Sequence, residues 1–327
     1  MVNEQIRKNS SRTDGLTIAY IVLCHDEPHL LGRVAKSLRY GNDRLFVHVD
    51  KKVTETPFLE AVQGLENVQF VSHREEIYWG GFSSIVATME SIRDVLQSGI
   101  IYDRIVLLQG KDYPLHSPAY IHSFFQAHST EEFCHAINVT TSPNPRDYMK
   151  CCGYWRMDGK KSFKDKVINK ALAFFNCKLK VKYRKGYFCN SDQRWDVYKG
   201  WAQVAITSKC AKYILDIYDQ CPAYNKFMRH RFPPDEIYIH TILHNSFFRD
   251  NISNYRLVPR KTAEWESTDL NLTYFEYPAY VTVFKDEEEL SDLLSTKALF
   301  LRKVTYGESA SLLEEIDKFI LSEMNTL

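Results

Sequence analysis

The feature that most constrains the fold is an alternation of short apolar runs with amphipathic helical segments in the first 130 residues. Four runs predict strands: Leu16–Leu23, Leu45–Val49, Val68–Val71 and Ile101–Leu108. The first and the last are continuous apolar runs typical of buried strands. Apolar residues at helical spacing predict helices over His29–Tyr40, Ser83–Leu96 and Ser117–Gln126. This order is βαβ-like, so we predict an α/β fold with a mainly parallel sheet flanked by helices.

The second half of the chain gives weaker signals between residues 140 and 200, and regular patterns return after Gly200. We predict helices over Ser208–Tyr218, Pro234–His244, Asp286–Leu294 and Ser309–Leu321, and an extended segment over Leu272–Phe284. No repeat or long linker divides the chain. We therefore expect a single domain, residues 16–327, with an elaborated C-terminal half.

Composition narrows the class of protein. The net charge is +1 and the pI is about 7.6, which gives no polyelectrolyte signal for a nucleic-acid partner. No apolar run reaches the roughly 20 residues that cross a bilayer, and the polar residues 1–15 are interpreted as a disordered leader. The eight cysteines include no CxxC pair, so a reduced cytoplasmic protein is expected. An oxidised pair among Cys151, Cys152, Cys177 and Cys189 remains open.

Polar residues follow three of the predicted strands. They are His25-Asp26, Asp50-Lys51-Lys52 and Lys111-Asp112. In parallel sheets, ligands bind beyond the carboxyl ends of the strands, and three such ends converge here. Each of these ends, taken alone, can equally be no more than the polar end of a strand.

A basic segment covers residues 156–185, begins at Arg156 and encloses the apolar stretch Ala171–Phe175. Such a segment can lie on an anionic membrane surface or meet an anionic acceptor. It can also be a solvated surface of loop and helix.

Several nucleotide and metal motifs are missing from the sequence. There is no GxGxxG turn, no GxxxxGK[ST] loop and no GxSxG elbow. No two aspartates stand two residues apart, so the Asp-x-Asp pair with which sugar-nucleotide enzymes usually hold a divalent ion is absent. His240 and His244 have a chelating i, i+4 spacing, but without the glutamate of HExxH they are better explained as core or surface histidines. We predict no metal site.

Three further stretches carry groups that could do chemistry. In Pro233–Glu236, proline and two carboxylates suit a helix start, and a carboxylate held by amide groups can also serve as a general base. In Leu299–Lys303, the cations Arg302 and Lys303 could neutralise a diphosphate or simply complement a helix dipole. In Tyr78–Ser83, two glycines between aromatic residues allow either close approach to a flat ligand or a tight turn.

Taken in order, these stretches resemble the core-2/I-branching β-1,6-N-acetylglucosaminyltransferase family, which includes the peptide O-xylosyltransferases. The resemblance covers residues 17 to 304 with a divergent middle. It rests on the segments IAYIVLCHDEPHLLGRVAKSL, LFVHVDKK, EIYWGGFSSIVATMESI, YDRIVLLQGKDYPL, FPPDEIYIHTILHNSFF and DLLSTKALFLRKV.

The resemblance implies a GT-A glycosyltransferase fold, a sugar-nucleotide donor, inversion at the anomeric carbon and no divalent metal or other cofactor. Residues 16–130 would be the nucleotide-binding half and residues 131–327 the acceptor half. The motif VHVDKK places Asp50, Lys51 and Lys52 at the base and ribose of UDP. The wall of the uridine site would comprise Val22, Cys24 and His25.

Other matches concern the reacting centre. Trp79 stands where the branching enzymes carry an aromatic residue that contacts the donor. Glu236 matches the catalytic base, and Lys303 matches a lysine that contacts the diphosphate. We expect Asp112 to orient the donor or acceptor sugar, and Asp235 and Arg156 to contact the acceptor.

The chain departs from the family pattern in two places. The branching enzymes pair the diphosphate lysine with an arginine, and an ungapped match puts Tyr280 near that position; Arg302 or a mobile basic loop would substitute. The GSQW segment is only partly kept, as Gly200-Trp201-Ala202-Gln203, which leaves the donor sugar open. Animal members have a membrane anchor, whereas this chain looks like a bacterial cytosolic relative.

The sequence thus suggests an inverting, metal-independent transferase that moves a sugar from a UDP-sugar to a glycan hydroxyl. UDP-GlcNAc is the first choice of donor, ahead of UDP-xylose and UDP-galactose. The expected acceptor is a surface polysaccharide growing on a lipid carrier, with peripheral contact to an anionic membrane. A non-catalytic nucleotide-sugar or glycan-binding relative is one alternative; a nucleotidyltransferase, which would need a metal carboxylate pair, is another.

Overall fold

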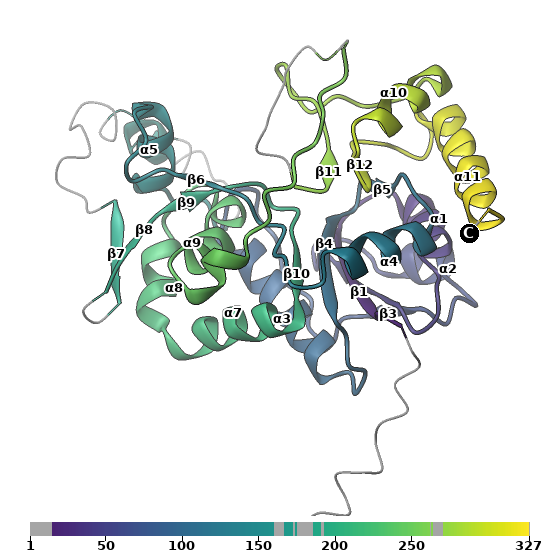
Figure 1. Cartoon of the computed structure of the whole chain (residues 1–327). Coiled ribbons are helices and arrows are strands. Elements are labelled where there is room, and N and C mark those ends of the chain that lie inside the picture. Colours follow the sequence, from purple (N-terminus) through teal and green to yellow (C-terminus); the bar gives the residue numbers. More distant parts are fainter. Residues whose placement is uncertain are drawn as a thin grey trace, which may run out of the picture.

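The central sheet has five strands in the order β10-β4-β1-β2-β3 (Figure 1). The computed structural model describes residues 15–159, 167–172, 174, 186–190, 193–261, 263 and 271–326. Four strands run parallel: β1 (Ile18–Cys24), β2 (Arg44–Val49), β3 (Val68–Phe70) and β4 (Arg104–Gln109). The edge strand β10 (Ala205–Thr207) pairs antiparallel with β4. The predicted parallel α/β sheet is therefore confirmed, and it is consistent with a GT-A-like domain.

Both faces of the sheet are buried because the strands alternate their side chains between two apolar clusters. Tyr20 and Val22 of β1 belong to one cluster, and Ala19 and Ile21 belong to the other. The first cluster is covered by α1 (Pro28–Ser37), α2 (Thr56–Ala61), α4 (Pro118–Ala127) and α11 (Ala310–Met324). The second is covered by α3 (Ser83–Gln97), α7 (Ser208–Gln220), α8 (Pro222–Met228) and α9 (Tyr238–His244). Continuous apolar strands are the expected consequence of this double cover.

A second sheet extends the carboxyl-terminal edge of the first. Its three strands are β11 (Thr273–Tyr274), β12 (Phe300–Arg302) and β5 (Asp112–Pro114), in that order. Because β5 follows β4 within three residues, this small sheet brings the C-terminal segment to the point where β4 ends. The last helices, α10 (Leu290–Ser295, preceded by η3, Glu287–Glu289) and α11, pack beside it, and α11 is tied to α1 by an Arg33–Asp317 ion pair of 2.7 Å.

The remaining elements form the side of the molecule that is drawn at the left of Figure 1. They are α5 (Pro145–Cys152), β6 (Ile137–Asn138), β7 (Tyr187–Asn190), β8 (Gln193–Asp196), β9 (Tyr198–Lys199), η1 (Pro234–Glu236) and η2 (Phe247–Asn251). Strand β6 pairs with β9, and β7 pairs with β8.

Two predicted elements differ from the structure. The helix expected over Pro234–His244 is broken at Ile237 into η1 and α9, because the Glu236 carbonyl accepts a hydrogen bond from the Gly200 amide. The extended segment Leu272–Phe284 contributes only the short β11. It leaves the sheet after Tyr274, and the following loop is closed by a bond from the Thr282 amide to the Glu276 carbonyl. Helices α2, α5 and α8 are not indicated by the sequence pattern.

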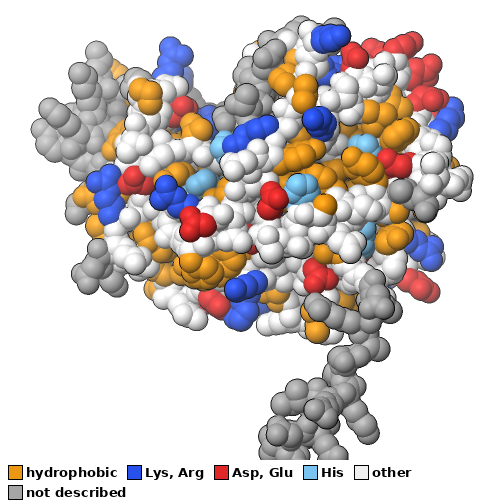
Figure 2. All heavy atoms as spheres, viewed as in Figure 1, with side chains coloured by type: hydrophobic (Ala, Val, Ile, Leu, Met, Phe, Trp, Pro, Cys, Tyr) orange, Lys and Arg blue, Asp and Glu red, His pale blue; other side chains and the backbone are white. Residues whose placement is uncertain are grey.

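Some predictions fall partly outside the described residues. Residues 1–14 and most of the basic segment 156–185 lie outside them, and so does Cys177. The seven cysteines that the structure describes are free thiols. Across the described ranges, no helix combines the length and apolarity needed to cross a bilayer. Figure 2 shows one face of the molecule, on which acidic and basic side chains are interspersed rather than gathered into one patch.

Candidate active site

The polar strand ends predicted from the sequence meet at one edge of the sheet. The Asp50 amide donates to the Cys24 carbonyl, and the Gly110 amide donates to the Leu23 carbonyl. A Cβ added at Gly110 would lie 2.7 Å from the Cβ of Cys24, so glycine is what lets the turn after β4 pass this close to β1. Beyond the turn, Lys111 Nζ lies 2.6 Å from Asp26 Oδ2.

The end of β2 is organised by Asp50, whose side chain is largely buried. Its Oδ1 accepts a 2.9 Å hydrogen bond from the Lys52 amide, and its Oδ2 lies 3.3 Å from Lys52 Nζ. Lys52 also donates to the Ile77 carbonyl and lies over the Tyr78 ring. Lys51 is exposed. Both Asp50 oxygens are thus occupied by Lys52, and nucleoside contact by Asp50, Lys51 and Lys52 stays a prediction.

The residues expected at the uridine wall divide into two kinds. Val22 and Cys24 are 3% exposed and pack in the core under the edge of the sheet. The His25 side chain is 70% exposed above them. The structure therefore leaves His25 available for direct contact, whereas Val22 and Cys24 support the backbone.

Asp112 occupies the centre of this edge. Its side chain has no exposed surface, and Arg302 Nη1 donates a 2.8 Å hydrogen bond to its Oδ1. Its Oδ2 accepts from the Gln109 amide at 2.8 Å and from Gln203 Nε2 at 3.3 Å. This differs from the expectation that Asp112 touches a sugar, because both oxygens are occupied within the protein. On this geometry Asp112 holds Arg302, and direct sugar contact stays a prediction that would require one of these bonds to open.

Cations from separate segments collect near the same edge. The Arg302 side chain is 21% exposed, and Lys303 follows it directly at the end of β12. The Val304 amide donates a 3.1 Å hydrogen bond to the Lys111 carbonyl, and Arg302 pairs with Asp112 across β12 and β5, so Lys111 and Lys303 lie on neighbouring segments. Tyr280, near which the family arginine would fall, is 85% exposed. Arg302 is thus an anchored cation within reach of this edge.

The candidate base, Glu236, lies at the end of η1. Its side chain is 21% exposed, and its Oε2 lies 3.5 Å from Lys199 Nζ. Burial and the neighbouring Asp235 raise the pKa of Glu236 to about 7, while Lys199 and Lys150 act in the opposite direction. A carboxylate with a pKa near neutrality is suited to accept and release a proton at physiological pH.

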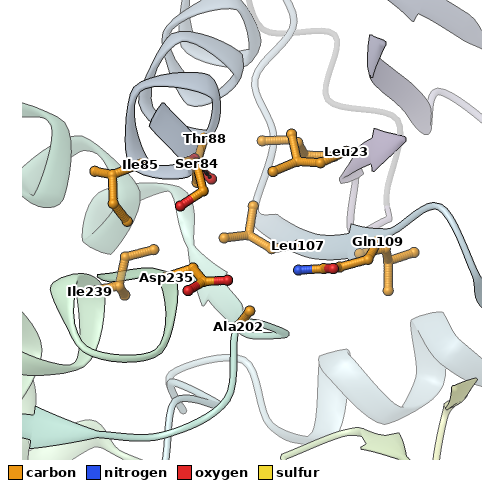
Figure 3. Close-up of a pocket in the computed structure, with 11 residues that line it drawn as sticks. Leu23, Ser84, Ile85, Thr88, Leu107, Gln109, Ala202, Asp235 and Ile239 are labelled. Atoms are coloured by element: carbon orange, nitrogen blue, oxygen red, sulfur yellow. Dashed lines mark hydrogen bonds between the residues drawn. The ribbon is translucent and has the colours of Figure 1, made fainter. Parts of the chain in front are cut away.

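Asp235 points into a small cavity of about 30 Å³ between the PDE segment and the sheet (Figure 3). The cavity is lined by Leu23 at the end of β1, by Gln109 at the end of β4 and by Ser84 of α3. Asp235 Oδ1 is buried without a hydrogen-bond partner among the described residues, and burial raises the pKa of Asp235. Asp235 was expected to contact the acceptor. Its position instead joins the PDE segment to the strand ends, and acceptor contact stays a prediction.

The loop Tyr78–Ser83 connects the end of β2 with the PDE segment. The Trp79 ring is 73% exposed and meets the Phe232 ring edge-on at 5.1 Å. Gly80 has a φ of +71°, and a Cβ there would overlap the Phe232 ring. Ser83 is not the side-chain cap of α3, since its Oγ accepts from the Tyr78 amide and its own amide donates to Asp158.

Arg156 lies in the exposed loop that carries Asp158. Its backbone amide and carbonyl bond the Asn169 side chain. Sequence reasoning missed Lys199, Lys150 and Gln203, which the fold brings to Glu236 and Asp112. Gln203 lies in the GWAQ segment, which already signalled the site; nothing in the sequence marks the two lysines.

The histidine pair is structural. His240 is fully buried, and its two ring nitrogens contact the carbonyl oxygens of Cys134 and Trp201. His244 also points at the Cys134 carbonyl. Among the described residues, no three His, Cys, Asp or Glu side chains are grouped as metal ligands. Metal independence itself stays a prediction.

Comparison with known proteins shows the family of this chain. The sequence model of the Core-2/I-Branching enzyme family matches residues 18–274. Xylosyltransferase 2 of Pan troglodytes is 28% identical over 120 residues, which are 36% of this chain and 14% of the relative. A probable β-1,3-galactosyl-O-glycosyl-glycoprotein β-1,6-N-acetylglucosaminyltransferase 7 of Sus scrofa is 27% identical over 113 residues, 33% of this chain and 26% of the relative.

A human N-acetyllactosaminide β-1,6-N-acetylglucosaminyl-transferase is 26% identical over 110 residues, 32% of this chain and 27% of the relative. Each of these alignments thus covers well under half of the relative's length, although all three relatives are named as glycosyltransferases. The family match, by contrast, runs from the first strand to β11 and includes the strand ends, the Tyr78–Ser83 loop and the PDE segment. This chain belongs to the Core-2/I-Branching enzyme family.

Proposed function

We propose that the protein is an inverting glycosyltransferase that moves a sugar from a UDP-sugar to a hydroxyl of a glycan acceptor. The observation that carries the proposal is the placement of Glu236. This carboxylate, with a pKa of about 7, stands beside Lys199. The adjacent Asp235 lines the cavity at the ends of β1 and β4, and Asp112, just beyond the end of β4, anchors Arg302. A proton acceptor and cations at one edge are what displacement of a diphosphate by a hydroxyl requires.

The proposed reaction is a direct displacement. Glu236 takes the proton of the acceptor hydroxyl as its oxygen forms a bond to the anomeric carbon. The bond from that carbon to the diphosphate oxygen breaks on the opposite face, and its electron pair leaves with UDP. Lys303 and Arg302 stabilise the negative charge of the departing diphosphate, and Asp50, Lys51 and Lys52 hold the nucleoside.

UDP-GlcNAc is our first choice of donor, followed by UDP-xylose and UDP-galactose. Two of the relatives are named for N-acetylglucosaminyl transfer and one for xylosyl transfer, and the incompletely kept GWAQ segment does not separate these choices. We propose a polysaccharide growing on a lipid carrier as acceptor, with the protein in the cytoplasm and in peripheral contact with an anionic membrane. The basic start of segment 156–185 motivates this last step.

The test combines a donor panel with Glu236→Gln. UDP-sugars that bind should raise the melting temperature, since a ligand at about 100 times its Kd adds roughly 2.7 kcal/mol of stability. The variant should keep this shift for the preferred donor but lose about 10²–10⁴-fold in UDP release. Near-normal turnover by Glu236→Gln would rule out Glu236 as the base. Absence of any donor binding in the wild-type protein would reject the proposed function.

A further inference from the structure

Lys199 is the only lysine of the described residues that forms an ion pair with Glu236. Both side chains are about four-fifths shielded, with 19% of Lys199 and 21% of Glu236 exposed. Burial lowers the pKa of Lys199, but Glu236 offsets this and the pKa is raised overall, so the ammonium stays charged at neutral pH. A shielded pair of this kind interacts more strongly than a surface ion pair, because water screens it less.

Backbone hydrogen bonds hold Lys199 beside Glu236. The Tyr198 amide donates to Thr241 Oγ1 at 3.0 Å, and the Gly200 amide donates to the Glu236 carbonyl at 2.9 Å. One residue further on, His240 Nε2 contacts the Trp201 carbonyl at 2.9 Å. These bonds lay residues 198–201 along η1 and α9 on both sides of Lys199. They fix the register between Lys199 and Glu236.

Gly200 makes this close packing possible. A Cβ at that position would lie 2.5 Å from the His135 carbonyl oxygen and 2.6 Å from Cε1 of His240. Any other residue would push the segment away from α9, and Lys199 away from Glu236. Lys199 Nζ also lies 5.6 Å from the Trp201 ring, which restricts the ammonium further.

The charges facing Glu236 come from several elements. Asp235 on η1 is a like charge, whereas Lys199 on β9 and Lys150 on α5 are opposite charges. The Cys151 thiol and Asp147 of α5 face Lys199, and Arg302 of β12 acts on Asp235. Burial and Asp235 therefore favour the protonated form of Glu236, and Lys199 is the larger of the two lysine contributions that oppose them.

We infer that Lys199 is a positioning residue of the proposed transfer reaction: its ammonium holds the Glu236 carboxylate in place and in the ionised form that accepts a proton. This inference rests on the proposed function. It assigns to Lys199 a role that is exerted through Glu236.

The experiment measures UDP release from UDP-GlcNAc, or from whichever UDP-sugar the panel selects, between pH 5 and 9. In Lys199→Met the acid limb of the kcat/KM profile should move up by about one pH unit, because the remaining carboxylate is harder to ionise. The rate should then fall roughly tenfold at pH 6 and recover toward the wild-type rate at pH 9. Lys199→Arg keeps the positive charge and should return the acid limb most of the way to its wild-type pH.

Two lysines serve as controls. Lys150→Met removes the exposed, weaker charge near Glu236 and should shift the limb by less than Lys199→Met. Lys212→Met removes a surface lysine of α7 that pairs with Asp216, and should leave the acid limb at its wild-type pH. A merely structural role for Lys199 would lower the rate equally at every pH and leave the limb in place.

The outcomes separate the inference from the proposed function. If the wild-type protein releases UDP and the acid limb of Lys199→Met lies at the wild-type pH, the inference is wrong and the transferase proposal stands. If the wild-type protein neither binds nor turns over any UDP-sugar, the proposed function fails first. Circular dichroism of Lys199→Met, together with recovery in Lys199→Arg, shows whether the variant is folded.

Discussion

When Glu236 ionises, it carries a negative charge at a place where burial and Asp235 favour the neutral form. Its carboxylate is mostly shielded, stands next to Asp235 and has only one ion-pair partner among the described residues, Lys199. Desolvation of a charge that is incompletely compensated raises the free energy of the folded state. Such a residue is typical of a functional site, where stability is given up for chemistry.

The raised pKa of Glu236 predicts that the folded protein loses stability as the pH rises, and that the Glu236→Gln variant lacks this loss. The folded pKa of Glu236 is about 7, above its ordinary value of 4.5, so the folded protein keeps a proton that the unfolded chain releases between these pH values. The stability that this proton contributes is fully present below pH 4.5 and is lost as the pH rises through 7. Between pH 5 and 8, the free energy of unfolding should therefore fall by roughly 2–3 kcal/mol more in the wild type than in Glu236→Gln.

Denaturant unfolding at the two pH values measures this difference. Glu314→Gln, on the exposed side of α11, is the matched control and should follow the wild type. Parallel pH profiles for wild type and Glu236→Gln would mean that Glu236 is ionised without penalty in the folded protein.

At the scale of elements, the Tyr78–Ser83 loop is the part that joins the end of β2 to the PDE segment. Lys52 reaches the Ile77 carbonyl on one side, and Trp79 meets Phe232 on the other. Phe232 precedes Glu236 by four residues, so displacement of the loop would also move the segment that carries Glu236. Gly80 sets the distance between the loop and Phe232, because its positive φ and missing Cβ allow the backbone to pass over the Phe232 ring.

Substitution of Gly80 by alanine should therefore lower turnover by tenfold or more while the protein remains folded. Gly64→Ala is the control, since Gly64 has a φ of +80° but open space around its Cβ position. Both variants should lose about 1 kcal/mol of stability through backbone strain, and only Gly80→Ala should also move the loop. Measurement of kcat/KM and melting temperature separates the two effects. Equal activity of the two variants would show that the loop does not control the base.

At the scale of the whole molecule, the sequence predicts the central sheet well because its strands are continuous apolar runs. The short strands β5, β10 and β12 carry no periodicity of their own and exist only through their partners. The site residues also divide into those that the sequence indicates and those that it does not. Strand ends and the PDE segment are visible in the sequence, whereas the Asp112–Arg302 pair joins residues 190 positions apart, and Lys199 reaches Glu236 only through tertiary packing.

The same assembly of distant segments bears on how a diphosphate would be held. The net charge of the chain is only +1, so attraction for UDP has to come from local cations rather than from the protein as a whole. The pairing of β5 with β12, and the bond from the Val304 amide to the Lys111 carbonyl, bring Lys111 after β4 to the same segment as Arg302 and Lys303 at the end of β12. Positive side chains at close range can perform the charge neutralisation for which other sugar-nucleotide enzymes use a divalent ion.

We therefore predict that EDTA leaves UDP-sugar turnover unchanged and that Lys303→Gln weakens UDP binding by about tenfold or more, equivalent to about 1.4 kcal/mol. Calorimetric titration with UDP, with and without Mn²⁺, measures both effects. Arg194→Gln, which removes an exposed cation on β8, is the control and should bind UDP as the wild type does. Strict dependence of wild-type turnover on Mn²⁺, or recovery of Lys303→Gln by added Mn²⁺, would show that a metal ion rather than these side chains neutralises the diphosphate.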